Sequence, residues 1–453
     1  MTTVRFHEAL KLAAAVLNNP VLADAPRPRL VRDVYGRLRF AVDCPEAQYP
    51  QHAMALLREV QSKLGVFATS SEVLSHDSFS FPQKVFRDSD WHATLVDLGS
   101  DEDGNPLGKV SVDLLDRQVT GQDWLRPVTE EHATLRRPHR IVFFGLKGGV
   151  GRSTALCMTA WGLARQGKRV LLIDFDLESP GLSGLVLPPS KVAEFGVVDW
   201  LVEDAVGQGD SVLPRMVAAS PLSESTINAI RVAAAIGQGE TDYLAKLARA
   251  YADVPSEDGP KRLGQRLRKL VEALEAQEQP DVVLIDSRAG LHDLAAVAIT
   301  SLADTAMLFT TDGAQSWSGY RQLFSHWQQR PEIARRVRER LTIVRALTPK
   351  VGREAGVERF QQQAYDLFSE TLYDEIPAGH VTGDADGDET LFHPDISDES
   401  APHSPVLIDW DDRFQEFNPM LRPEDGGVNQ AQIDATFGAL IGYALERTEE
   451  GAE

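Results

Sequence analysis

The stretch Arg140-Ile-Val-Phe-Phe-Gly-Leu-Lys-Gly-Gly-Val-Gly-Arg-Ser-Thr154 decides the fold of this chain. Four apolar residues, Ile141 to Phe144, predict a short buried strand, and a glycine-rich turn follows them directly. A helical apolar pattern begins at Ser153. Glycines allow a close backbone approach to an anion, and the first turn of a helix adds unpaired N–H groups. The stretch therefore predicts a phosphate-binding loop, with a chance glycine cluster in a surface turn as the alternative.

These residues resemble the deviant P-loop of the ParA/MinD family, whose usual form is Lys-Gly-Gly-x-Gly-Lys-Ser/Thr. The chain reads Lys147-Gly148-Gly149-Val150-Gly151-Arg152-Ser153-Thr154. The resemblance implies that these eight residues bind ATP. It also implies that Lys147 reaches the phosphates of a partner subunit and that Ser153 is a ligand of Mg²⁺.

The chain departs from the family at Arg152, where the usual P-loop lysine would stand. Arginine keeps the positive charge but replaces a compact ammonium with a bulkier planar group. We therefore expect ATP binding to be retained and hydrolysis to be slow. By resemblance, Lys147 and Arg152 count as catalytic residues.

Two further apolar runs end in aspartate. Residues 170–173 lead into Asp174-Phe-Asp176, and residues 282–285 lead into Asp286. Carboxylates at the C-terminal ends of parallel strands face the ligand crevice. The resemblance implies that residues 174–182, which begin with this Asp-x-Asp, belong to the first switch segment of the family. It also implies that Asp176 orients the attacking water, whereas Asp174 and Asp286 support the magnesium site. The alternative for the first run is an acidic turn that caps a helix.

The residues after Asp286 differ from the family's usual second switch segment, because Ser287-Arg288-Ala289-Gly290 follows it. Two interpretations of Arg288 stay open. It could touch a γ-phosphate or the partner subunit, or it could pair with a switch carboxylate.

From residue 140 onward, strand and helix patterns alternate, which predicts an α/β fold with a doubly wound, mostly parallel sheet. A strand is expected at 226–236. We expect a ParA/MinD-like ATPase domain over 140–446, with an acidic loop at 378–404. Residues 1–135 predict a small N-terminal α+β accessory module, including a hairpin around Tyr35-Gly36.

Composition excludes several classes of protein. Apolar and charged fractions of 43% and 25% are ordinary, and no apolar run approaches the length of a membrane span. The N-terminus lacks the features of a signal peptide, and two cysteines suit a reducing compartment, so a cytoplasmic protein without membrane attachment is expected. No histidine pair has zinc-site spacing, and no Gly-x-Ser-x-Gly elbow is present.

An arginine-rich cluster could bind DNA, as ParA proteins use a C-terminal basic surface for this purpose. Its members are Arg330, Arg335, Arg336, Arg338, Arg340, Arg345, Lys350 and Arg353. The alternative is a solvated helix face paired with Glu332 and Glu339. A net charge of −21 favours the alternative, because it opposes approach to a polyanion.

Together these patterns predict a ParA/MinD-like switch ATPase that binds ATP and Mg²⁺ and hydrolyses ATP slowly. An ATP-dependent homodimer closed through Lys147 and an unidentified protein partner are expected. Two alternatives stay open. A sensor or scaffold would bind ATP without hydrolysing it, and Arg152 is the feature that favours it. A DNA-associated partitioning or regulatory ATPase would depend on the arginine-rich cluster.

Overall fold

The computed structural model of the 453-residue chain describes residues 4–68, 70–88, 90–101, 103–126, 137–239, 242–256, 259–376, 391–415 and 417–451. The chain divides into two compact units. The smaller unit contains Met1–Arg126 with Ser325–Glu332, and the larger contains Pro127–Phe324 with Ile333–Glu453. Of the acidic loop expected at 378–404, residues 378–390 lie outside the described part of the chain.

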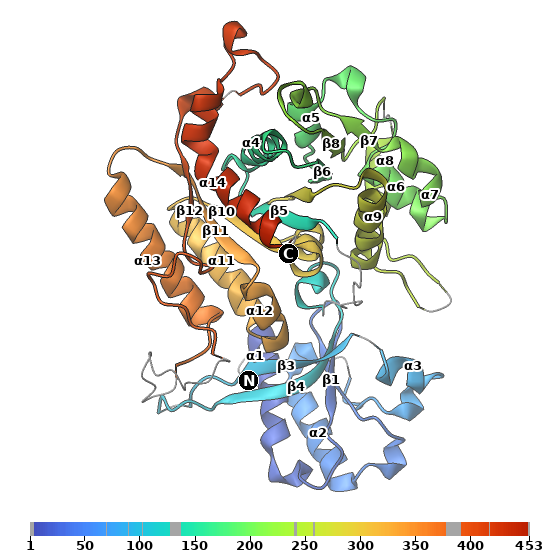
Figure 1. Ribbon diagram of the computed structural model, residues 1–453. Helices are drawn as coiled ribbons and strands as arrows, with labels where there is room; N and C mark the ends of the chain where they lie inside the picture. The colour runs from blue at the N-terminus through green and yellow to red at the C-terminus, as the bar shows by residue number, and fades with distance from the viewer. Residues whose placement is uncertain are drawn as a thin grey trace. The chain divides into compact units, whose positions relative to one another are not determined.

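The larger unit is built on an eight-stranded sheet with strand order β12-β11-β10-β5-β9-β6-β8-β7 (Figure 1). Every neighbouring pair is parallel except β7 and β8, so the expected doubly wound, mostly parallel sheet is confirmed. The strands are β5 (His139–Gly145), β6 (Val170–Phe175), β7 (Val217–Ala219), β8 (Ile230–Ala233), β9 (Val282–Ser287), β10 (Thr305–Thr310), β11 (Leu341–Thr348) and β12 (Val406–Asp409).

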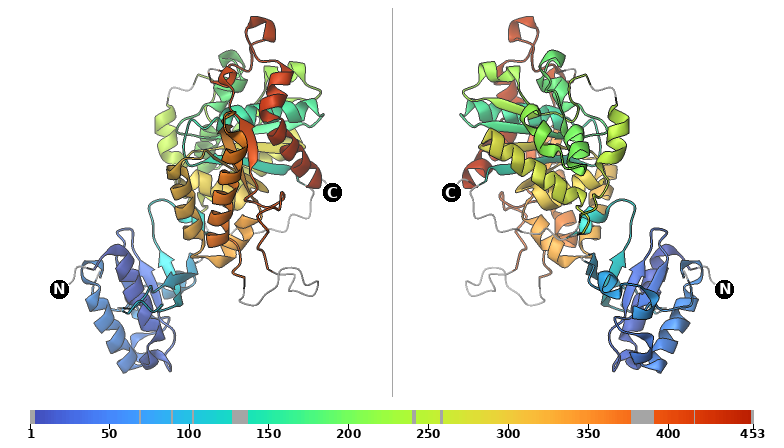
Figure 2. Two further views of the ribbon diagram at one scale, coloured as in Figure 1. Left: turned by 90° about the vertical axis from the view of Figure 1, so that its left-hand side faces the viewer. Right: turned by 90° about the vertical axis from the view of Figure 1, so that its right-hand side faces the viewer.

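Helices cover both faces of this sheet, as the two views in Figure 2 show. On one face, Phe143 and Leu172 of the sheet share a hydrophobic core with Leu440 of α14. On the other face, the ring of Phe144 packs edge-on against Tyr320 of α11. The helices are α4 (Arg152–Arg165), α5 (Leu182–Val186), α6 (Val197–Ala205), α7 (Gly209–Val212), α8 (Tyr243–Ala250), α9 (Leu263–Glu278), α10 (Asp293–Val297), α11 (Ala314–Trp327), α12 (Pro331–Arg338), α13 (Arg353–Thr371) and α14 (Gln430–Glu450).

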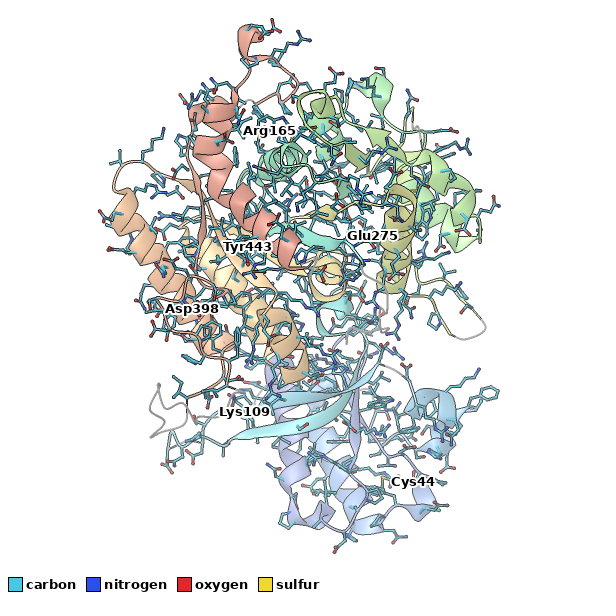
Figure 3. All side chains as sticks on the ribbon, in the orientation of Figure 1. Cys44, Lys109, Arg165, Glu275, Asp398 and Tyr443 are labelled. Atoms are coloured by element: carbon cyan, nitrogen blue, oxygen red, sulfur yellow. The ribbon has the colours of Figure 1, made fainter. Side chains whose placement is uncertain are left out.

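A buried ion pair fixes the start of β5, the strand that leads into the glycine-rich turn. Arg140 donates from Nε and Nη2 to the two carboxylate oxygens of Glu275 on α9, at 2.6 and 2.7 Å. Both side chains are buried. Glu275 is labelled in Figure 3. A two-pronged arginine–carboxylate pair has a defined geometry as well as a favourable energy. The pair therefore fixes where α9 lies against the start of β5.

The smaller unit is an α+β fold, as expected. Its four-stranded sheet has the order β2-β1-β4-β3. β1 and β2 pair antiparallel as the hairpin that the sequence predicts, and β1 and β4 pair parallel. The elements are α1 (Phe6–Ala15), β1 (Arg29–Arg32), β2 (Leu38–Ala41), α2 (Gln51–Lys63), α3 (Pro82–Phe86), β3 (Trp91–Asp97) and β4 (Lys109–Asp116).

The segment Ser325–Glu332 belongs to the smaller unit through specific hydrogen bonds. Trp327 Nε1 donates to the carbonyl oxygen of Trp124 at 3.1 Å, and Arg330 Nη1 donates to that of Leu125 at 2.9 Å. The two tryptophan rings lie 5.9 Å apart. Trp124 is therefore a buried packing residue of this unit.

Among the helices of the described residues, none combines the length and apolar character needed to span a membrane.

Candidate nucleotide-binding site

The predicted P-loop joins β5 to α4: its first five residues, 147–151, lie in the turn, and its last three, 152–154, begin the helix. β5 ends at Gly145 and α4 begins at Arg152. Gly149 and Gly151 have φ angles of +78° and +76°, which L side chains rarely adopt, so the turn depends on glycine at both positions. A Cβ built on Gly148 or Gly149 would meet no atom within 4 Å. The loop is therefore open at these glycines, and an anion has room to approach the backbone N–H groups there.

The side chain of Arg152 points at two carboxylates. Its Nε donates to Asp286 Oδ1 at 2.6 Å, and its Nη2 donates to Asp176 Oδ2 at 2.9 Å. All three residues are at least nine-tenths buried. Burial would lower the pKa of Arg152, but the charges of Asp286 and Asp176 raise it above its ordinary value. The structure thus brings together three of the predicted site residues in one buried ion-pair network.

Parallel strand pairing explains why residues so distant in sequence meet. Asp174 on β6 stands opposite Asp286 on β9, and β9 also pairs with β5, the strand that leads into the loop. The C-terminal ends of the three strands therefore lie at one edge of the sheet. Ser153, in the first turn of α4, donates from Oγ to Asp286 Oδ2 at 2.7 Å. The three predicted metal ligands are thereby gathered at this edge.

Asp174 is the least satisfied group of the site. Its Oδ1 accepts a hydrogen bond from the backbone N–H of Asp176 at 3.0 Å, whereas its buried Oδ2 has no hydrogen-bond partner. Burial raises the pKa of Asp174 well above its ordinary value, and the charge of Asp286 raises it further. A buried carboxylate oxygen without a partner is costly in water-excluded surroundings. A cation bound next to it would remove this cost.

These residues fit Mg²⁺, which prefers oxygen ligands such as a hydroxyl and one or two carboxylates. No cluster of three or more histidine, cysteine or acidic side chains forms a complete metal site within the described residues. That finding is compatible with Mg²⁺, because this ion usually keeps several waters and takes other ligands from substrate phosphates.

The side chain of Lys147 contacts a neighbouring helix of its own chain. Its Nζ donates to Gln315 Oε1, in the first turn of α11. The sequence offers no signal for this contact, because the two residues are 168 positions apart. Gln315 is thus a candidate site residue that the sequence interpretation missed.

Arg288 pairs with a carboxylate of the first switch segment. Its Nη1 forms an ion pair with Glu178 Oε1, which agrees with the second of the two interpretations that the sequence left open. Glu178 itself was not singled out from the sequence. It follows the Asp174-Phe-Asp176 motif by two residues, and that position is the only signal that could have found it.

Four of the eight residues of the arginine-rich cluster pair with carboxylates of the same chain. Arg338 pairs with Asp374 at 2.9 Å and Arg353 with Asp409 at 3.0 Å. Arg330 pairs with Glu332 at 2.6 Å, as the sequence alternative proposes. Arg345 is buried with Asp312 at 4.0 Å. These side chains are therefore occupied by carboxylates rather than displayed together to a polyanion.

Residues 139–343, which are less than half of the chain, match the AAA_31 family model, described as an AAA domain. The matched segment contains the P-loop and both aspartate-ended strands. A search of curated proteins gave no significant match.

Several solved structures resemble the chain at low identity. A ParA family ATPase from Chlorobium tepidum has 14% identity and a TM-score of 0.38, with 70% of this chain and 97% of that chain covered. The pNOB8 ParA bound to nonspecific DNA has 17% identity and a TM-score of 0.41, with 69% and 99% covered. Cobyrinic acid a,c-diamide synthase from Mycobacterium smegmatis, with an ATP analogue and magnesium, has 18% identity and a TM-score of 0.36, with 53% and 86% covered.

The family match, the P-loop sequence and the strand order define the class of this domain. Residues 139–343 form a ParA/MinD-like P-loop ATPase domain, and the recognition made from the sequence is confirmed.

Proposed function

We propose that the chain is an ATP-dependent switch protein, in which the P-loop binds ATP with Mg²⁺ and two copies close around the nucleotide. Slow hydrolysis then resets the pair. The observation that supports this proposal is the open glycine loop with Ser153, Asp174 and Asp286 gathered beside it. An unidentified protein is the expected partner of the ATP-bound form.

Different residues of the site would bind the phosphates and Mg²⁺. The N–H groups of the loop and of the first turn of α4 would hold the phosphates. Ser153 and Asp286, with Asp174 beside them, would hold Mg²⁺, which supplies charge neutralisation on the phosphates. Arg152 uses Nε and Nη2 for the two carboxylates, so a phosphate would contact the guanidinium through Nη1 or by displacing one of the carboxylates.

The pair between Arg152 and Asp176 gives a physical reason for slow turnover. Asp176 is the residue expected to orient the attacking water, but its Oδ2 accepts a hydrogen bond from Arg152. For Asp176 to act through Oδ2, that bond must open. Since both groups are buried, opening the pair leaves charge uncompensated until a ligand arrives.

Asp176→Ala is therefore expected to lower the rate of phosphate release by about a hundredfold, the size of effect typical for a positioned proton-accepting group. Affinity for a fluorescent ATP analogue should stay within a few-fold of the wild-type value, because Asp176 is not placed to hold the phosphates. The two quantities are measured on the same preparations. Unchanged turnover in Asp176→Ala would remove the catalytic role, and absent turnover in the wild type would favour the sensor or scaffold alternative.

The dimer is tested through Lys147. We expect the molecular mass from light scattering to double with a slowly hydrolysed ATP analogue and Mg²⁺, but not with ADP. Lys147→Ala should remain monomeric while it still binds the analogue, because Lys147 lies at the exposed side of the loop. Lys168→Ala is the matched control, since this lysine pairs with Glu449 outside the loop. A wild-type protein that stays monomeric with bound analogue would contradict the dimer.

DNA is not the partner that we propose. Four of the eight basic residues of the cluster pair with carboxylates, and the net charge of the chain is −21. Phosphate contacts by free basic side chains supply most non-specific affinity for DNA.

A further inference from the structure

Glu178 is a meeting point of three segments of the larger unit. Its Oε1 accepts from Arg288 Nη1 and from the hydroxyl of Tyr251, and His292 Nε2 lies 3.5 Å away. Glu178 belongs to the segment after β6, whereas Arg288 and His292 belong to the segment between β9 and α10. Tyr251 directly follows helix α8. One carboxylate oxygen therefore joins the first switch segment, the second switch segment and α8.

The donors around this oxygen are well defined. His292 Nδ1 accepts from the backbone N–H of Leu294 at 3.4 Å, which leaves Nε2 to carry the proton and to point it at Glu178. The rings of Tyr251 and His292 pack edge-on at 5.2 Å. Burial raises the pKa of Tyr251, and its hydrogen bond to Glu178 raises it further, so the hydroxyl stays a donor.

Helix α8 is tied to the first switch segment a second time. The hydroxyl of Tyr243, the first residue of α8, donates to the carbonyl oxygen of Leu177 at 2.5 Å. Leu177 thus binds the tyrosine that begins α8, and Glu178 binds the tyrosine that follows the last residue of α8. A displacement of these two residues would have to move α8 or break both bonds.

Helix α8 is also bound to two other helices. Lys246 Nζ donates to Asp199 Oδ1 on α6 at 2.6 Å. Arg266 on α9 is fully enclosed and donates from Nη1 to the carbonyl oxygens of Ala250 and Ala252, at 3.2 and 3.1 Å. Helix α8 is therefore bound to the switch segment, to α6 and to α9, and Figure 1 shows α6 and α9 beside it.

The junction has an unused acceptor. Glu178 Oε2 is buried and has no hydrogen-bond partner, while the other oxygen of the same carboxylate faces three donors. A buried acceptor without a partner is unfavourable. A rearrangement that gave Oε2 one of the three donors would remove this cost.

We propose that Glu178 is a positioning residue that couples the two switch segments to helix α8, so that a change at either switch moves α8. This inference rests on the proposed function for the identity of the signal, which is bound nucleotide. It adds an element outside the P-loop and the switch segments, namely α8, as the part of the fold that reports the nucleotide state.

Hydrogen exchange of the full chain, followed by mass spectrometry, tests the junction first without nucleotide. Glu178→Gln should speed exchange about tenfold both in peptides covering 286–292 and in peptides covering α8, because it removes a charged acceptor that both share. Tyr251→Phe should speed exchange in α8 alone. Glu194→Gln is the control, since Glu194 pairs with Arg215 on the surface and should alter neither region.

A second measurement adds a slowly hydrolysed ATP analogue with Mg²⁺. In the wild type, exchange should change at 174–182 and at α8 together. In Glu178→Gln it should change at 174–182 only. Equal changes at α8 in both proteins, or a nucleotide-free Glu178→Gln in which 286–292 and α8 do not loosen together, would overturn the coupling. If the wild type binds no analogue, the proposed function is contradicted. The comparison without nucleotide would still test the coupling through Glu178.

Discussion

Gly151→Val is expected to abolish nucleotide binding, with the affinity for a fluorescent ATP analogue falling by about a thousandfold or more, or ~4 kcal/mol. Gly151 is the residue before α4 and has a φ of +76°, a conformation that a β-branched side chain does not adopt without strain. Valine would force the loop to change shape where the N–H groups of the first helical turn begin. Its Cβ would also lie 3.8 Å from Leu347 Cδ2, which limits the ways in which the loop can relax.

Gly167→Val is the matched control for this experiment. Gly167 has a φ of +84° and lies in the turn after α4, where an added Cβ would meet no atom within 4 Å. Both substitutions should lower stability by a similar amount, because both place valine at a positive φ. Only Gly151→Val should lose the nucleotide. If Gly151→Val still binds within a few-fold of the wild type, the glycine loop is not the nucleotide site.

The sequence predicts the P-loop and the sheet well because both depend on local patterns. Four apolar residues, a glycine turn and a helix start lie next to one another in the chain, so no distant contact is needed to identify them. Parallel pairing then places Asp174 opposite Asp286, since both end strands that flank one another in the sheet. The positions of the predicted metal ligands therefore follow from topology rather than from detailed packing.

The partners of the charged side chains do not follow from such patterns. Arg152 contacts Asp176 and Asp286, which are 24 and 134 positions away, and a P-loop motif says nothing about where this side chain points without a nucleotide. Glu178 and Tyr251 are 73 positions apart. The strand expected at 226–236 is also shorter, because β8 covers only Ile230–Ala233. Thr226 instead makes a turn, in which its hydroxyl donates to the carbonyl oxygen of Asn228.

Arg152→Met is expected to lower the free energy of unfolding by about 3–5 kcal/mol at neutral pH without nucleotide, the usual cost of removing one partner of a buried ion pair. Methionine fills a similar part of the space without a charge. Asp286, only 1% exposed, would then keep its hydrogen bond from Ser153 but lose its cation. Asp176 would lose the same guanidinium. Urea unfolding followed by circular dichroism measures the difference.

The pH dependence of this loss distinguishes charge from packing. Burial raises the pKa of Asp286 even with Arg152 present, and removal of the guanidinium should raise it further. A carboxyl group whose pKa is raised by folding costs stability above that pKa, and the cost disappears as pH falls below the unfolded value of 3.8. The deficit of Arg152→Met should therefore shrink as the medium becomes acidic, whereas a packing defect would persist.

Arg152→Lys restores the lysine that is usual at this position in the family. Lysine keeps the charge but presents a compact ammonium, which cannot span both carboxylates as the planar guanidinium does. We expect this variant to lose less stability than Arg152→Met and to hydrolyse ATP at the wild-type rate or faster, because Asp176 is released more easily. Equal stability of Arg152→Met and the wild type would mean that the two carboxylates do not depend on Arg152. Slower turnover in Arg152→Lys would show that arginine is needed for catalysis and does not hinder it.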